Sequence, residues 1–195
     1  MTNARILLAL TWVTVVAACS APPAAPPAPA APTPAEIVAR GEYLVNTSGC
    51  HDCHTPWQMG PNGPEPDMTR ALSGHPADMP VTKPPTMTEP WVMAAAGTNT
   101  AWAGPWGISF TANLTSDPNS GIGMSVWTEA LFIAAIRDGK HLGTARPILP
   151  PMPWPAYRNM NDDDLKSIFA YLRTVPPIAN NVPEPISPED VAKMK

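Results

Sequence analysis

The sequence predicts a mainly α-helical domain in which a few amphipathic helices are joined by long irregular loops. Three observations predict this fold class. Apolar residues recur at helical spacing in three segments, and no segment shows a convincing strand-like alternation. About eighty residues rich in proline, glycine and tryptophan separate the first helix from the second, and a loop of that length in a compact domain usually has a function.

The first helix is predicted from Ala35 to Val45, directly after Pro34. Val38, Gly41 and Leu44 lie on one face of it, so the segment is amphipathic and can pack against a core. The same segment continues into the most informative motif of the chain.

That motif is CHDCH at residues 50–54, an instance of the CxxCH pattern by which a haem is attached covalently. Cys50 and Cys53 lie one helical turn apart, so each sulfur can add to one vinyl group of a single haem, and His54 is placed to bind the iron. The alternatives are a CxxC redox pair and two ligands of a zinc site. A redox pair needs a βαβ setting, which this sequence lacks. A structural zinc needs four ligands, and no second cysteine pair supplies the other two. The motif therefore predicts one covalently attached haem c with His54 as the proximal ligand.

Four tryptophans lie in or beside the long loop region, at positions 91, 102, 106 and 127. Disordered segments are poor in aromatic residues, so these side chains favour burial over disorder. We expect the loop to wrap the flat, apolar cofactor, with the tryptophans packed against it.

Two further helices follow the loop. One is predicted from Trp127 to Asp138, with Gly139 as its stop signal. The other begins after Asn161, a good N-cap, and carries three aspartates in its first turn, where they complement the helix dipole. Its apolar stripe comprises Leu165, Ile168, Phe169 and Leu172.

The sixth iron position decides what a haem can do, and a methionine is the predicted ligand. The segment PILPPMPW presents Met152 in a loop stiffened by prolines, which cannot be helical. Met160 is the next candidate, while His75 and His141 are the candidates for a bis-histidine haem. His51 is badly placed because it lies inside the attachment motif.

The N-terminus predicts export. Arg5 precedes an apolar run that ends at Ala18, too short to span a bilayer and typical of a secretory signal. Because small residues precede Cys19, we expect a lipoprotein signal over residues 1–18 and acylation of Cys19. The competing interpretation is an ordinary signal cut nearby.

The rest of the chain divides into three parts. An alanine- and proline-rich tether covers residues 19–35, one domain covers residues 36–178, and a C-terminal tail covers residues 179–195. The formal net charge of −4 argues against nucleic acid as a partner.

Taken together, these segments resemble a class I cytochrome c. The stretches that carry the resemblance are RGEYLVNTSGCHDCHTP, FTANLTSDPNSGIG, RDGKHLG and PPMPWPAYRNMNDDDLKSIFAYLRTVPP. They are similar to haem domains of bacterial periplasmic cytochromes, including subunits of membrane-associated alcohol or nicotinate-type dehydrogenases, which usually carry several such domains where this chain has one. The resemblance implies a cytochrome c-like fold, with Cys50 and Cys53 holding the haem, His54 and Met152 as axial ligands, and Gly41 at the crossing of the first and last helices, where Tyr171 or Phe169 packs.

The function expected from these residues is single-electron transfer rather than catalysis. Histidine and methionine together leave no open iron position, and methionine raises the reduction potential. The expected partners are redox proteins, a dehydrogenase or an oxidase, and the membrane through a lipid anchor, with no small-molecule substrate. The expected location is the periplasmic side of a bacterial membrane. The alternatives are a haem enzyme or a gas- or peroxide-binding protein with a labile sixth ligand, and a subunit whose haem is structural.

Overall fold

The computed structural model describes residues 30–195, and the fold reported below is that of residues 32–195. The predicted signal, Cys19 and most of the predicted tether lie outside the described residues. In order along the chain, the elements are α1 (Pro34–Thr47), α2 (Cys50–His54), β1 (Trp57–Gly60), β2 (Gly63–Pro66), η1 (Met68–Arg70), β3 (Ala94–Ala95), β4 (Ala101–Gly104), β5 (Gly107–Phe110), α3 (Glu129–Asp138), η2 (His141–Gly143), α4 (Trp154–Tyr157), α5 (Asp162–Leu172) and α6 (Pro188–Lys193). Within the described part, no helix is both long and apolar enough to cross a membrane.

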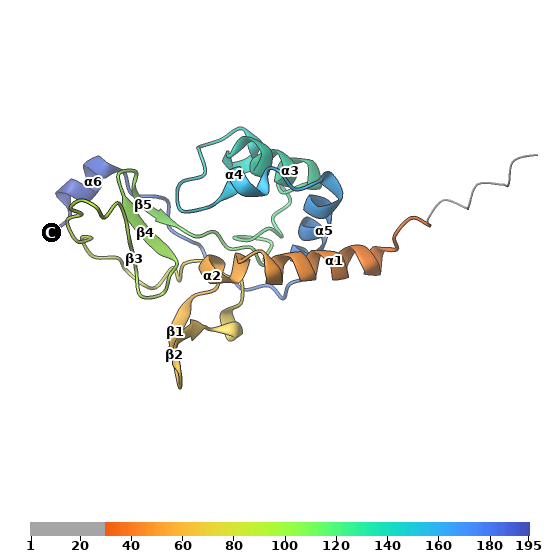
Figure 1. The fold of residues 1–195 in the computed structure, drawn as a ribbon, viewed down its shortest axis with the longest axis horizontal. Helices are drawn as coiled ribbons and strands as arrows, with labels where there is room; N and C mark the ends of the chain where they lie inside the picture. The colour runs from red at the N-terminus through yellow and green to blue at the C-terminus, as the bar shows by residue number, and fades with distance from the viewer. Residues whose placement is uncertain (1–29) are drawn as a thin grey trace, which may run out of the picture. The chain divides into compact units, whose positions relative to one another are not determined.

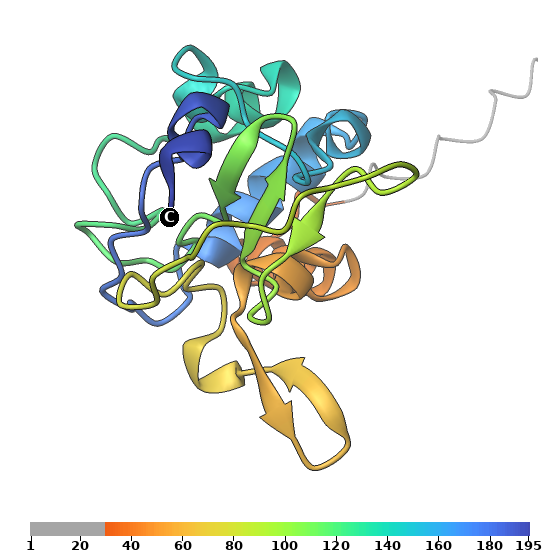
Figure 2. The same cartoon turned by 90° about the vertical axis from the view of Figure 1, so that its left-hand side faces the viewer.

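The prediction of a mainly α-helical fold is wrong. Two antiparallel sheets stand beside the helices, one formed by β1 and β2 and one with the order β3-β4-β5, so the fold is mixed α/β (Figure 1). The three-stranded sheet lies at one end of the domain beside α6, and the helices α1, α3 and α5 lie at the other. The β1–β2 hairpin projects away from both (Figure 2).

The pattern of apolar and polar residues did not predict the strands, because each is only two to four residues long. Alternation of apolar and polar residues is informative only over about four to eight residues. Both hairpins are instead specified by their turns: Gly60 pairs with Gly63, and Gly104 pairs with Gly107. Gly107 needs a positive φ of 93°, which glycine adopts without strain. The glycines and prolines that suggested irregular loops therefore also form tight turns.

The three predicted helices are confirmed, with small shifts of their ends. Thr33 caps α1 in a capping box with Glu36, Thr128 caps α3, and Asn161 caps α5 as predicted. Gly139 ends α3 in the left-handed conformation, with a φ of 64°.

The core lies where α1 crosses α5 and α3 packs beside them. Gly41 is buried at the crossing, as predicted: a Cβ there would lie 1.9 Å from the carbonyl oxygen of Ser167 and 2.7 Å from the Cβ of Tyr171. The buried apolar cluster is Leu44, Val45, Leu72, Ile122, Phe132, Ile136, Leu165, Ile168, Leu172 and Val175.

The segment predicted as a C-terminal tail packs on the sheet side. Ile186 forms an antiparallel bridge with Ile108 of β5, through two backbone hydrogen bonds of 2.9 Å. The side chain of Asn180 bonds to the backbone of residues 73, 75 and 77. Ile186 thus adds one bridge at the β5 edge of the three-stranded sheet, and Asn180 fastens the loop that precedes the sheet.

Candidate functional site

The CHDCH motif forms the short helix α2, which follows α1 after a sharp turn. Ser48 ends α1, and Gly49 makes the turn with a φ of 74°, a conformation that favours glycine. Cys50 and Cys53 are not joined in a disulfide, and both are partly buried. Burial raises the pKa of the Cys50 thiol to about 11 and also raises that of Cys53. Such thiols stay protonated, unlike the low-pKa thiolate of a reactive redox pair.

Four of the five motif residues, all except His51, line a cavity of about 440 Å³ inside the domain. Cys50, Cys53 and His54 contribute to its lining, and the rest of the wall is largely apolar. The volume lies within the roughly 300–1,000 Å³ typical of cofactor sites. Side chains of the three-stranded sheet, of helices α3, α4 and α5, and of the segments that join β5 to α3, α3 to α4 and α4 to α5 complete the lining. Among them are Trp102, Phe110, Leu114, Ile122, Trp127, Phe132, Ile136, Ile148, Met152, Tyr157, Met160, Leu165, Ile168 and Leu172.

The His54 ring is oriented by a backbone acceptor. Its Nδ1 lies 2.8 Å from the carbonyl oxygen of Ala112, so Nδ1 carries the proton and donates it. Nε2 is then the unprotonated nitrogen, the form that binds a metal. Burial lowers the pKa of His54 and keeps the ring neutral.

Both candidate methionines line the cavity. Met152 lies in the loop before α4, and Met160 lies between α4 and α5; each is half-buried against the apolar core. Figure 1 shows α2 and α4 on opposite sides of the domain interior. The hydroxyl of Tyr157 in α4 donates to the carbonyl oxygen of Ser48, which ties the segment after Met152 to the end of α1.

The histidines separate into two groups. His141 lines the cavity and packs edge-on against Trp127, with ring centroids 5.3 Å apart. His75 does not line it: the ring is fully buried elsewhere, with Nδ1 2.9 Å from the Thr100 hydroxyl and Nε2 3.1 Å from the carbonyl oxygen of Met79. His51 also lies outside the lining and bonds to Thr55.

Burial of the loop tryptophans follows the prediction in part. Trp102 and Trp127 line the cavity, and Trp106 is half-buried in the β4–β5 turn. Trp91 is 73% exposed, so its predicted burial is wrong. The segment around Trp91 is held at the outer edge of the sheet by a strand of only two residues, which gives its side chain no cover.

The cavity lining also includes polar side chains. Trp102 lines the cavity, but its Nε1 is fully buried and is the one buried side-chain donor or acceptor without a partner among the described residues. Arg146 contributes to the same lining. A haem brings two carboxylates as well as a flat apolar ring, so a guanidinium in the lining of an otherwise apolar cavity fits that group. Arg146 carried no sequence signal, whereas Trp102 was among the tryptophans expected to pack against the cofactor.

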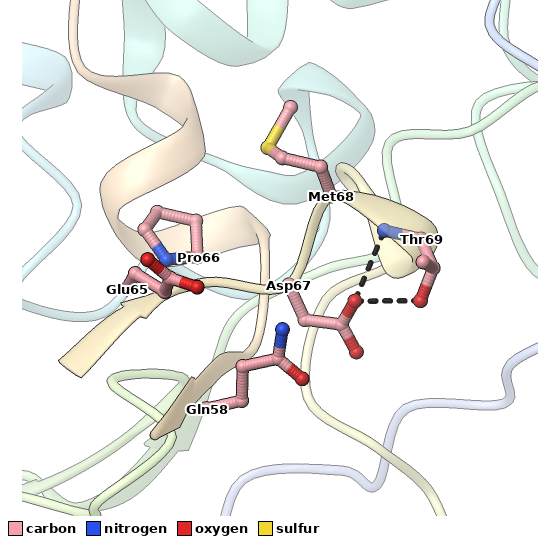
Figure 3. A pocket seen from close by; sticks show the side chains of 6 residues that line it. All are labelled: Gln58, Glu65, Pro66, Asp67, Met68 and Thr69. Atoms are coloured by element: carbon pink, nitrogen blue, oxygen red, sulfur yellow. Dashed lines mark hydrogen bonds between the residues drawn. The ribbon is translucent and has the colours of Figure 1, made fainter. Parts of the chain in front are cut away.

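A second cavity, of about 460 Å³, lies at the base of the β1–β2 hairpin and contains none of the predicted site residues (Figure 3). Gln58, Glu65, Asp67 and Thr69 lie around it. The Asp67 carboxylate accepts hydrogen bonds from the hydroxyl and amide of Thr69 and from Arg70, which lower its pKa. This carboxylate is therefore engaged in holding η1.

Proteins similar to this chain include subunits of bacterial dehydrogenases, and several of these are named as cytochrome subunits. The chain is 28% identical over 151 residues to the alcohol dehydrogenase (quinone), cytochrome c subunit, of Gluconobacter oxydans, which covers 76% of the chain and 24% of the relative. It is 28% identical over 146 residues to the fructose dehydrogenase cytochrome subunit of Gluconobacter japonicus, covering 73% and 23%. Over a shorter stretch of 84 residues it is 36% identical to one of the subunits of nicotinate dehydrogenase from Pseudomonas putida, covering 40% and 6%.

The chain spans about a quarter of the length of the two cytochrome subunits. No family model matches it. The similarity to cytochrome c subunits covers about three quarters of the chain. It supports a cytochrome c domain with haem c as its cofactor.

Proposed function

We propose that this chain carries single electrons through one haem c, which Cys50 and Cys53 hold covalently and which His54 and Met152 ligate. One observation carries the proposal: Cys50, Cys53 and His54 line the same largely apolar cavity as Met152, which lies about a hundred residues later in the chain. When bound, a haem with these two ligands supplies reversible exchange of one electron at a raised potential.

The chain's own residues have distinct tasks in this function. The carbonyl oxygen of Ala112 keeps the proton on Nδ1 of His54, so that Nε2 is the metal-binding nitrogen. The apolar walls from α3 and α5 exclude water from the cavity. Arg146, whose Nε also pairs with Glu184 over 3.3 Å, provides N–H donors for a carboxylate of the cofactor.

Covalent attachment is tested by mass spectrometry of protein matured in a host with haem-attachment machinery. We expect one haem mass that survives denaturation, and its loss in the Cys50→Ser/Cys53→Ser variant. A haem-free wild-type mass under these conditions contradicts the proposal. Wild-type protein that acquires zinc instead, in stoichiometric amount, supports the alternative metal site.

A dehydrogenase is the proposed electron donor, because the relatives are named as subunits of such enzymes. We further propose that the protein is exported and held at the periplasmic face of a membrane by lipidation of Cys19. Stable anchoring takes two or more acyl chains. Cys19→Ser is expected to release the protein from the membrane fraction, and a wild type that is soluble after export would refute the anchor.

A further inference from the structure

A chain of hydrogen bonds joins the three-stranded sheet to the loop that carries Met152. Ser109 of β5 lies 2.6 Å through its hydroxyl oxygen from the carbonyl oxygen of Pro150, two residues before Met152. Trp106 Nε1 donates to the same hydroxyl over 3.2 Å. A hydroxyl has one proton, so Ser109 donates it to Pro150 at the shorter distance and accepts from Trp106.

The methionine loop has few other polar attachments. Prolines at positions 150, 151 and 153 lack a backbone N–H, so they cannot donate to a neighbouring segment. Among the residues that the structure describes, the bond from Ser109 is the only hydrogen bond that reaches residues 149–152. The loop is fastened at Ile148, whose amide donates to Gly139, and again from Pro153 onward.

The donor strand is itself held on both sides. β5 pairs with β4 along its length, and Ile108 bridges to Ile186 on the other side. Ser109 is 6% exposed and lies between these contacts. A short bond from a buried, doubly supported strand restricts where the loop can lie.

From these contacts we infer that Ser109 is a positioning residue that holds Met152 at the haem site. This inference rests on the proposed ligation by Met152. Trp106 orients the Ser109 hydroxyl, and the hydroxyl fixes the Pro150 carbonyl and so the loop. Without the bond, the loop moves more freely and the methionine ligand dissociates more often.

The test compares Ser109→Ala with Ser167→Ala in the haem-loaded protein. Ser167 is a matched control: it is 5% exposed and also donates to a backbone carbonyl, that of Asp163 over 2.7 Å, but within α5 and outside the cavity lining. The readouts are the methionine-to-ferric-iron charge-transfer band and the rate at which carbon monoxide binds the reduced protein. In Ser109→Ala we expect a weaker band and carbon monoxide binding about fivefold faster, the factor that corresponds to about 1 kcal/mol for a lost neutral hydrogen bond.

Two more variants complete the test. Ser109→Thr keeps a hydroxyl and should restore the wild-type rate, whereas Trp106→Phe, which removes the N–H donor together with part of the indole ring, should raise the rate less than Ser109→Ala. Equal rates in Ser109→Ala and Ser167→Ala overturn the inference, and if Ser109→Ala does not fold, an unchanged rate in Trp106→Phe overturns it.

Met152→Ala separates the role of Ser109 from the assignment of Met152 as ligand. If it abolishes the band while Ser109→Ala has no effect, only the role of Ser109 fails; if it leaves the band intact, the ligand assignment fails and the role of Ser109 with it.

Discussion

The helical side of the domain and the sheet side are held together in different ways. On the helical side, α1 packs directly on α5 through Gly41, and the contact consists of close backbone approach and apolar side chains. On the sheet side, segments far apart in the chain are joined by side chains that bond to backbone, as Asn180 does with residues 73–77 and Ser109 with Pro150. The cavity lies where the two sides meet. Close packing therefore positions the helical wall of the cavity, and hydrogen bonds from side chains to backbone position the sheet wall.

The largest expected effect is a break of the helical side at Gly41. Gly41→Ala places a methyl group 1.9 Å from the Ser167 carbonyl oxygen, which backbone movement must relieve. We expect a loss of roughly 3 kcal/mol in the free energy of unfolding, at the upper end of overpacking costs, measured by denaturant unfolding. Gly97→Ala is the control, because no atom lies within 4 Å of a Cβ built there. Equal stability of the two variants would show that the helix crossing is looser than described.

The sheet side is probed at Asn180, with a smaller expected effect. Its side chain makes three bonds to backbone, with distances of 2.7, 2.8 and 2.9 Å. Asn180→Ala should cost about 2 kcal/mol, since each net bond contributes about 1 kcal/mol and water recovers part of the loss. Hydrogen exchange should rise in residues 73–77 while α1 and α5 stay protected. Asn159→Ala, an exposed asparagine bonded only to its own helix turn, should change neither. A uniform rise in exchange across both sides would contradict their separate support.

Most of what the sequence predicted correctly belongs to the helical side. The caps Asn161 and Gly139, and the small residue at 41, are local signals whose meaning does not depend on distant residues. The CHDCH motif is a local signal in the same sense, and the attachment of haem to it stays a prediction. The sequence could not point to Ser109, because its proposed role depends on a contact between a strand of four residues and a loop 41 residues later. Likewise, proline flanking singled out Met152, whereas both Met152 and Met160 line the cavity.

The smallest expected effect is a pH dependence on the sheet side, at His75. Burial lowers the pKa of this ring, and its hydrogen bond to the Thr100 hydroxyl joins it to the sheet region. The unfolded chain binds a proton near the ordinary histidine pKa of about 6.5, whereas the folded chain resists protonation until lower pH. His75 therefore contributes stability that is present above about pH 6.5 and lost as the pH falls toward its folded pKa.

Denaturant unfolding at a series of pH values measures this contribution. Between about pH 7.5 and pH 5, the wild type should lose more stability than His75→Gln, because that variant has no proton to take up at this position. Identical pH slopes for the two proteins would mean that protonation of His75 is not linked to folding.

Identifying the sixth ligand of the haem iron is the most direct test of the proposed electron carrier. Met152→Ala and Met160→Ala, each loaded with haem, are compared by the ferric charge-transfer band and by carbon monoxide binding to the reduced form. We predict that Met152→Ala loses the band, has a lower reduction potential and binds carbon monoxide rapidly. A thioether ligand favours reduced iron, and it occupies the sixth position, where carbon monoxide would bind. Met160→Ala should keep the wild-type spectrum. The reverse pattern would identify Met160 as the ligand. An unchanged spectrum in both variants would contradict ligation by either residue and leave Met124 and His141, which line the same cavity, as the candidates.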